Sequence, residues 1–283
     1  MYRLLSEVVS DDRNPADSVV SFDFGTLQFI RPEGCVVLAN LVEWLMRNDA
    51  DCRFQCPSPE ESKPVEYLDD SQFFADYLGE SLSDSASPRR TTIPLQRVAY
   101  QESHGWLKSQ LVPWLSNRLS MTEKSFSSIR ACLGEIFNNI KDHAGEGVEV
   151  GCFFAQHYPR EDRVQVAVSD FGVGIPANVR AVEESYLSDG QAIEQATEAG
   201  FTTESQPGNR GAGLNTLLHD VIEANGGELY IHSNRGMLSC AQDGSDDIQR
   251  ISDEVSGVYP GTLISISFRT DTIENIPEEE FRW

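Results

Sequence analysis

The sequence predicts a two-layer α/β fold, in which a smaller α/β domain precedes a larger one. The first observation is a long amphipathic helix over residues 122–144, whose apolar side chains recur at steps of three and four and form one stripe. The second is the run Val164–Ser169, which alternates and is rich in β-branched residues, as strands are. The third is the alternation of strands and helices before residue 83. Together they predict a sheet covered by helices in each domain.

The smaller domain is predicted over residues 1–84. Its expected elements are strands at Val20–Phe24, Leu27–Ile30 and Cys52–Cys56 and helices at Cys35–Met46 and Ser71–Leu82. A Ser-rich stretch that is poor in apolar residues follows, so residues 85–121 are interpreted as a linker and a helical connector. The helical part is expected at Val98–Leu119.

The larger domain is predicted over residues 122–283. After the long helix, its expected elements are strands at Val148–Ala155 and Val164–Ser169, helices at Ala177–Leu187, Gln191–Ala199 and Leu214–Asn225, and strands at Leu229–Ser233 and Leu263–Phe268. The acidic stretch Asp243–Glu254 is expected to be a surface insertion.

Composition excludes several classes of function. The chain has 283 residues, of which 40% are hydrophobic and 24% charged, as in a globular protein. No apolar run reaches the roughly 18–20 residues of a membrane span, and the N-terminus lacks the apolar core of a secretory signal. The net charge of −23 repels a nucleic-acid backbone, so neither nucleic acid nor membrane is expected as a partner. Six scattered cysteines without zinc-site spacing favour a reducing, cytoplasmic location.

Three polar residues share one row on the long helix. Glu135, Asn139 and His143 are each four residues apart, so their side chains lie in file beside the apolar stripe. A carboxylate can take a proton from water or a hydroxyl, and an amide oxygen can ligate Mg²⁺. Such a row can line a cleft, and it is equally compatible with the solvated side of an ordinary helix.

Two glycine-containing turns follow this helix. The strand at 164–169 runs into Asp170-Phe-Gly-Val-Gly-Ile-Pro176, where a carboxylate can accept a hydrogen bond and glycines let the backbone approach a flat ring. The run Gly208-Asn-Arg-Gly-Ala-Gly-Leu214 opens a helix, where backbone N–H groups can meet phosphate oxygens. Each motif alone is compatible with a plain turn.

This ordered set resembles the GHKL ATPase superfamily, which includes DNA gyrase B, MutL, histidine kinases and anti-sigma-factor serine kinases. The resemblance covers residues 122–270 and implies a Bergerat-type α/β sandwich with a mixed sheet that binds ATP and Mg²⁺. It makes Glu135 the catalytic general base and Asn139 the metal ligand. It also makes the segment from about Pro176 to Arg210 an ATP lid.

The remaining cofactor positions are implied by the same resemblance. Asp170 would select adenine through its exocyclic amine, and Thr262 would help on the adenine side. Arg210 and Asn209 are the nearest candidates for the phosphates, and Arg210 is as compatible with a plain surface position. The positions assigned to ATP are Asn139, Asp142, His143, Asp170, Gly172, Gly174, Ile175, Arg210, Gly211, Gly213, Leu214 and Thr262.

The N-terminal segment resembles a STAS domain, the fold of anti-sigma-factor antagonists, through Phe24–Leu41 and Tyr67–Phe74. In that family a phosphorylatable Ser usually stands just before the helix. Here the corresponding run is Arg31-Pro-Glu-Gly34, which has no hydroxyl group. The phosphorylation switch therefore does not carry over, and a scaffold or docking role is expected.

The expected function is that of a regulatory protein that binds Mg-ATP and hydrolyses it, so that lid closure changes a protein interface. Two alternatives stay open: a serine/threonine kinase of the anti-sigma-factor kinase type, and a binding module that senses ATP without hydrolysing it. A protein partner is expected on the STAS-like domain or the lid, and a homodimer is also compatible with the sequence.

Overall fold

The computed structural model describes residues 1–143, 148, 150–183, 186–201, 213–242 and 248–277, with the backbone alone described at 140–143. The α-helices are α1 (Tyr2–Val8), α2 (Pro32–Arg47), α3 (Lys63–Asp70), α4 (Phe73–Leu78), α5 (Ser103–Trp106), α6 (Val112–Leu119), α7 (Ser127–His143), α8 (Ile175–Val182), α9 (Asp189–Ala196) and α10 (Gly213–Leu218). The 3₁₀-helices are η1 (Tyr100–Glu102) and η3 (Glu123–Phe126), and the π-helical segments are η2 (Leu107–Leu111) and η4 (His219–Ala224). The strands are β1 (Val19–Asp23), β2 (Asp51–Gln55), β3 (Thr92–Ala99), β4 (Val150–Tyr158), β5 (Arg163–Asp170), β6 (Glu228–Gln242) and β7 (Ile248–Arg269).

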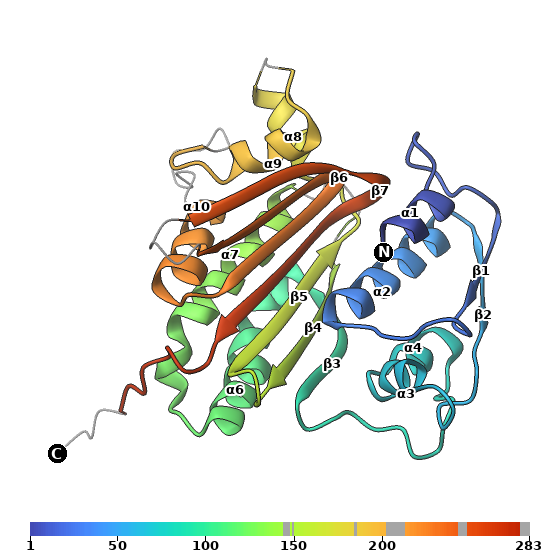
Figure 1. Cartoon of the computed structure of the whole chain (residues 1–283), viewed down its shortest axis with the longest axis horizontal. Coiled ribbons are helices and arrows are strands. Elements are labelled where there is room, and N and C mark those ends of the chain that lie inside the picture. Colours follow the sequence, from blue (N-terminus) through green and yellow to red (C-terminus); the bar gives the residue numbers. More distant parts are fainter. Residues whose placement is uncertain (144–147, 149, 184–185, 202–212, 243–247, 278–283) are drawn as a thin grey trace.

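A five-stranded sheet in the order β3-β4-β5-β7-β6 forms the centre of the molecule (Figure 1). Each neighbouring pair in this sheet is antiparallel, so the prediction of a mixed sheet is wrong. The helical crossover from β5 to β6 does leave these two strands parallel to each other. However, β7 lies between them and pairs with both. A parallel pairing occurs instead between β1 and β2, in a separate two-stranded sheet.

Helices α5, α6, α7 and α10 cover one face of the five-stranded sheet. Leu133 and Phe137 of α7 share a core with Val166 and Val168 of β5. Because alternate residues of a strand face opposite sides, the even-numbered residues of β5 face this helical layer. In Figure 1 the green helices of this layer lie behind the strands.

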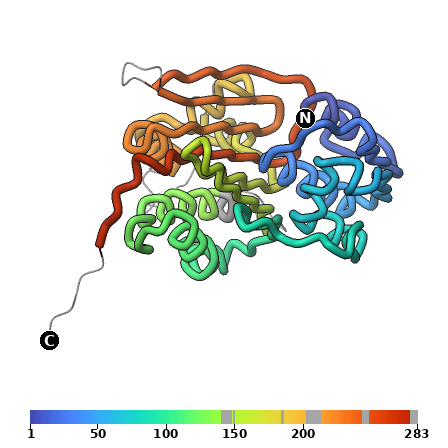
Figure 2. The backbone as a smooth tube through the Cα atoms, turned by 60° about the horizontal axis from the view of Figure 1, so that its bottom comes forward, coloured from blue at the N-terminus to red at the C-terminus, as the bar shows by residue number. Residues whose placement is uncertain are grey.

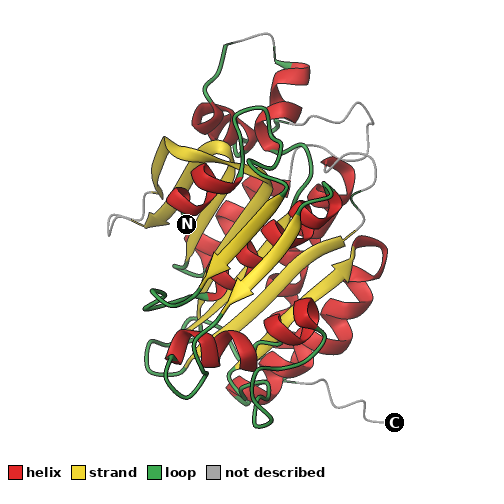
Figure 3. Cartoon of the chain, turned by 90° about the vertical axis from the view of Figure 1, so that its right-hand side faces the viewer, coloured by secondary structure: helices red, strands yellow, loops and turns green. Residues whose placement is uncertain are grey.

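The first 82 residues, called the N-terminal unit below, cover the other face of the sheet. Helix α2, which has Pro32 at its first turn, packs on β4 and β5, while α1 packs on β7. Ala167 of β5 and Leu263 of β7 belong to the core on this side. Figures 1 and 2 show the blue N-terminal elements apart from the green helices, and Figure 3 shows helices on both sides of the strands. The sheet therefore has no bare face along β4, β5 and β7.

Most predicted elements are confirmed within a few residues of their expected bounds. They are β1, α2, β2, α7, β4, β5, α8, α9 and α10. The predicted antiparallel pairing of the strands around Val148–Ala155 and Val164–Ser169 is also confirmed, as β4 with β5.

Two predictions in the N-terminal unit are wrong, the second in part. Residues 27–30 form no strand, because the chain passes from a turn after β1 into α2. The helix predicted at Ser71–Leu82 is confirmed only over α4 (Phe73–Leu78), and the preceding helix α3 (Lys63–Asp70) was not predicted. These two helices are separated at Gln72, whose φ of 69° is left-handed and breaks helical continuity.

Two further predictions are wrong in part within the sheet. The segment called linker and connector is helical at 100–119, as predicted, but its part at Thr92–Ala99 is β3. This edge strand contains Pro94, and an edge position tolerates the missing N–H group. The acidic stretch expected as an insertion lies partly outside the described residues, and its part at 248–254 belongs to β7. There it pairs with residues 236–242 of β6 and lengthens both strands beyond the predicted ranges.

Among the described residues, no helix combines the length and apolar character needed to cross a membrane. All six cysteines are free thiols.

Candidate functional site

Asp170 is a buried carboxyl group at the end of β5. It pairs in register with Thr262 of β7, and alternation along β5 directs its side chain toward the helical layer. The backbone N–H of Gly172 donates a hydrogen bond to its Oδ1 at 2.6 Å. Burial raises the pKa of Asp170 from its ordinary 3.8 to about 7, although the N–H groups of Gly172 and Thr262 and the charge of Arg13 oppose the shift. Each oxygen of a carboxylate can accept more than one hydrogen bond, so a carboxylate that is held in this way can also accept one from a ligand.

Ser233 of β6 joins the turn after Asp170 to strand β7. Its hydroxyl donates to the carbonyl oxygen of Gly261 at 2.7 Å and accepts from the N–H of Ile175, the first residue of α8, at 3.0 Å. It also lies 3.2 Å from the Thr262 hydroxyl. Ser233 fixes where α8 begins relative to Thr262. No sequence motif pointed to Ser233 as a site residue. What could have pointed to it is its position in a strand that pairs with the last strand.

Two glycines let these segments approach closely. Gly174 has a φ of 86°, and a Cβ there would lie 2.6 Å from the Ser233 hydroxyl oxygen. Gly261 has a φ of 114°, and a Cβ there would lie 2.5 Å from the Cα of Phe171. Left-handed backbone and these short distances both exclude a side chain. Gly172, as predicted, lies in the same turn and contributes its N–H to Asp170.

A second group of predicted residues meets where α7 and α10 touch. Asn139 of α7 lies against Gly213, the first residue of α10, so that a Cβ at Gly213 would lie 2.8 Å from Asn139 Nδ2. The Nδ2 atom is buried and has no hydrogen-bond partner among the residues that the structure describes. Glu135 lies one turn earlier on α7 and is exposed, while Leu214 packs partly buried against the helical core.

Both groups belong to the same end of the sheet. Helix α7 ends at His143, and β4 begins at Val150 only seven residues later. That start of β4 pairs with the end of β5, since Cys152 is the partner of Ser169. Figure 1 likewise shows α7 and β5 ending on the side where α8 and α9 lie. The structure therefore brings the polar row and the Asp170 turn to one edge of the fold, on the face that carries the helices.

Five predicted site residues receive no side-chain description. Asp142 and His143 lie within α7, where the backbone alone is described. Asn209, Arg210 and Gly211 lie outside the described residues. The predicted phosphate side of the site is thus represented by Asn139 and Gly213.

The two helices of the predicted lid are packed on the β6–β7 hairpin. Asp189, at the start of α9, accepts a hydrogen bond from the backbone N–H of Arg235 at 2.9 Å and pairs with Arg180 of α8 at 2.6 Å. Gly190 and Gly236 permit the close approach, because a Cβ at Gly190 would lie 2.7 Å from the Asp253 carbonyl oxygen. These contacts hold α9 against α8, β6 and β7.

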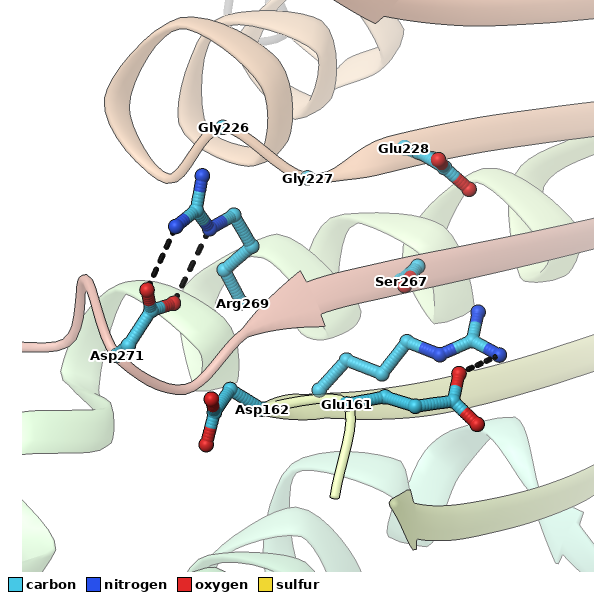
Figure 4. Close-up of a pocket in the computed structure, with 9 residues that line it drawn as sticks. Glu161, Asp162, Gly226, Gly227, Glu228, Ser267, Arg269 and Asp271 are labelled. Carbon is cyan, nitrogen blue, oxygen red and sulfur yellow. Dashed lines mark hydrogen bonds and ion pairs between the residues drawn. The ribbon is translucent and has the colours of Figure 1, made fainter. Parts of the chain in front are cut away.

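A pocket of about 270 Å³ lies at the opposite end of β5 (Figure 4). Its lining includes Glu161, Arg163, Arg269 and Asp271, and these side chains are paired with each other, Arg163 with Glu161 and Arg269 with Asp271. The two basic side chains are thus already paired, and Asp162 and Glu228 add negative charge to the lining, so this pocket offers little to bind the phosphates of a nucleotide and is not the candidate site.

Within the described part of the chain, no three His, Cys, Asp or Glu side chains cluster closely enough to hold a metal ion. A site in which one amide holds Mg²⁺ together with substrate phosphates and water does not require such a cluster. The side-chain oxygen of Asn139, which lies against Gly213, is of the type that could serve as that amide ligand. No model of a known protein family matches the chain, and no curated protein matches it.

Proposed function

We propose that this chain binds Mg-ATP as a regulatory ATPase of the GHKL type. The observation that carries the proposal is the buried Asp170 carboxyl group at the edge of the sheet. It is oriented by the Gly172 N–H at 2.6 Å and flanked by Thr262 and two glycines that tolerate no side chain. A carboxylate in this setting accepts a hydrogen bond from the exocyclic amine of adenine and rejects the carbonyl that guanine offers at that place.

The phosphate side of the proposal rests on Asn139 and Gly213. A glycine that opens a helix exposes backbone N–H groups to phosphate oxygens. The Asn139 amide beside it would hold Mg²⁺, which neutralises phosphate charge when bound. Glu135, four residues earlier and exposed, is proposed as the general base for an attacking water or hydroxyl group.

The protein partner of the proposed switch would dock on the N-terminal unit or on the segment that contains α8 and α9. Both touch the turn around Asp170, α8 by following it directly and the N-terminal unit by side-chain contacts. A conformational change in the N-terminal unit, or in the segment that contains α8 and α9, would therefore reach the Asp170 turn through few intervening residues.

Calorimetric titration with ATP and with GTP, both in Mg²⁺, tests the binding proposal. We expect ATP to bind and GTP to bind far more weakly, and Asp170→Asn to lose roughly 10- to 100-fold in ATP affinity, since a charge-assisted hydrogen bond contributes about 1.5–3 kcal/mol. Asp162→Asn, in the turn at the other end of β5, is the matched control and should bind ATP normally. Equal binding of ATP by the wild type and Asp170→Asn would refute the assignment of Asp170.

Incubation with γ-labelled ATP, with and without cell extract, separates the outputs. Free labelled phosphate indicates an ATPase, and label on a protein band indicates a kinase. Binding without either product indicates a sensing module.

A further inference from the structure

The N-terminal unit touches four consecutive residues of the turn that carries Asp170. From α2, the buried Asn40 side-chain amide donates to the carbonyl oxygen of Asp170 at 2.8 Å. At the end of α2, the Arg47 guanidinium lies 4.4 Å from the centre of the Phe171 ring. From the loop after α1, Arg13 donates to the carbonyl oxygens of Gly172 at 2.8 Å and Val173 at 3.0 Å.

Asn40 contacts the turn from inside the core. It has no exposed surface, and its Nδ2 also lies 3.1 Å from the Tyr259 hydroxyl. That hydroxyl hydrogen-bonds Ser169, whose own hydroxyl lies 3.0 Å from the Thr262 carbonyl oxygen. This buried polar network therefore ties α2 to the end of β5 and to the middle of β7, the two strands that flank the candidate base site. Buried polar groups of this kind hold one geometry, since a broken bond leaves an unpaired partner.

Arg13 contacts the turn from outside, and its loop is itself held in place. Within the loop, the backbone N–H of Arg13 donates a hydrogen bond to the carbonyl oxygen of Ser10 at 2.9 Å. Arg13 has a left-handed backbone conformation, with a φ of 59°. Asp11 in the same loop forms an ion pair with Arg235 of β6. These contacts hold the loop beside the turn, within reach of the two carbonyl oxygens that the Arg13 guanidinium binds.

We propose that Arg13, Asn40 and Arg47 are positioning residues of the nucleotide site, through which the N-terminal unit holds the turn at 170–174 in its base-binding conformation. The inference rests on the proposed function and extends it. The N-terminal unit is then more than a docking scaffold, because the site is complete only when that unit is folded against the sheet.

The charge of Arg13 gives this role a specific signature. Arg13 lowers the pKa of Asp170, against the larger effect of burial. The titratable groups that face Asp170 from other elements are Tyr100, Cys152 and Tyr259; burial raises the pKa of each, that of Cys152 to about 12, so all three are neutral near pH 7. Removing the charge of Arg13 should therefore move the titration of Asp170 to higher pH. Loss of packing alone would not single out that titration.

The test compares Arg13→Ala, Arg13→Lys and Arg47→Ala with the wild type in the full chain. The control is Arg53→Ala, which removes an equally basic residue of the N-terminal unit that pairs with Asp51 on the surface of β2. Two readouts are needed: hydrogen exchange of the amides of residues 171–175 without nucleotide, and ATP affinity from pH 6 to 9.

We expect Arg13→Ala to speed exchange in the turn, to weaken ATP binding on the order of tenfold, and to raise the pH midpoint of binding. Arg13→Lys keeps the charge but cannot bridge two carbonyl oxygens, so it should restore the midpoint without restoring slow exchange. Arg47→Ala should speed exchange and leave the midpoint in place, and Arg53→Ala should change neither.

If Arg13→Ala and Arg47→Ala both leave exchange, affinity and midpoint at wild-type values, the inference is wrong while the proposed function stands. If the wild type binds no ATP, the proposed function fails, and the inference as a statement about a nucleotide site fails with it; faster exchange would then show only that the N-terminal unit orders the turn.

Discussion

Gly213 and Asn139 are so close that the position of Gly213 admits no larger residue without a shift. A Cβ there would lie 2.8 Å from Nδ2 and 2.9 Å from Oδ1 of Asn139, the amide proposed to hold Mg²⁺. The contact joins the first turn of α10 to the polar row of α7. A substitution at this one position therefore tests whether the two halves of the predicted phosphate site work together.

We expect Gly213→Ala to lower Mg-ATP affinity by at least roughly tenfold, because the methyl group displaces the Asn139 amide; 1.4 kcal/mol of lost interaction suffices for that factor. The matched control is Gly105→Ala in α5, where a Cβ would meet nothing within 4 Å. Titration calorimetry with and without Mg²⁺ measures the effect. Normal Mg-ATP binding by a folded Gly213→Ala protein would remove Gly213 and Asn139 from the proposed site.

The pKa of Asp170 predicts how ATP affinity depends on pH. With a pKa of about 7, the carboxyl group of the free protein is mostly neutral at pH 6 and mostly ionised at pH 8. If the ionised form accepts from the adenine amine, binding should tighten by roughly tenfold over that range and level off above it.

Asp170→Asn is the control for this pH profile, because it removes the titrating group but keeps the titration of ATP itself. The ATP affinity of this variant, measured by the same calorimetry, should not show the rise with pH that the ionisation of Asp170 causes in the wild type. Tighter wild-type binding at pH 6 would instead mean that a neutral carboxyl group donates to a ring nitrogen, which contradicts the proposed geometry.

The same carboxyl group should lower the stability of the empty protein at high pH. Its folded-state pKa is raised to about 7 from an ordinary 3.8, so the folded state holds its proton longer than the unfolded chain does. Stability associated with Asp170 is therefore fully present below about pH 4 and is lost as pH rises to about 7. Asn does not titrate, so Asp170→Asn should gain stability relative to the wild type over this window.

We expect Asp170→Asn at pH 8 to have a Tm higher than the wild type by at least roughly 2–4 °C, which corresponds to about 1 kcal/mol. The difference should be smallest at pH 4. Thermal unfolding followed by circular dichroism across pH 4–8 measures it. A difference that does not change with pH would show that burial does not hold the carboxyl group neutral.

Local patterns in the sequence predicted the parts of the site that lie within one element or one turn. The spacing of Glu135 and Asn139 needs only helical periodicity, and the Asp170 turn needs only a strand followed by glycines. Gly213, which was expected to precede the helix at 214–225, is the first described residue of α10.

Contacts between distant segments could not be predicted in this way. Arg13 and Gly172 are 159 residues apart, and Asn40 and Asp170 are 130 apart, so no periodicity relates them. The missed strand β3 contains Pro94, which lowers its strand signal and is tolerated because the strand lies at the sheet edge. The acidic part of β7 was missed because Asp253 and Glu254 disfavour strands, while pairing with β6 overrides that preference.

Glu135 separates binding from chemistry. It is exposed on α7, four residues before Asn139, so it is free to face a water or hydroxyl group beside bound phosphates. Glu135→Gln keeps the shape and removes the base. Because an exposed side chain contributes little to the fold, Tm and Mg-ATP affinity should stay near wild type, while phosphate release or transfer falls by roughly 10²- to 10⁴-fold.

Glu123→Gln, at an exposed position in η3, is the matched control and should leave turnover unchanged. Labelled-phosphate release under saturating Mg-ATP gives the comparison. Wild-type turnover in Glu135→Gln would assign the base elsewhere. If the wild-type protein binds ATP but gives no product with any candidate partner, the polar row shapes the pocket and the chain acts as a sensing module.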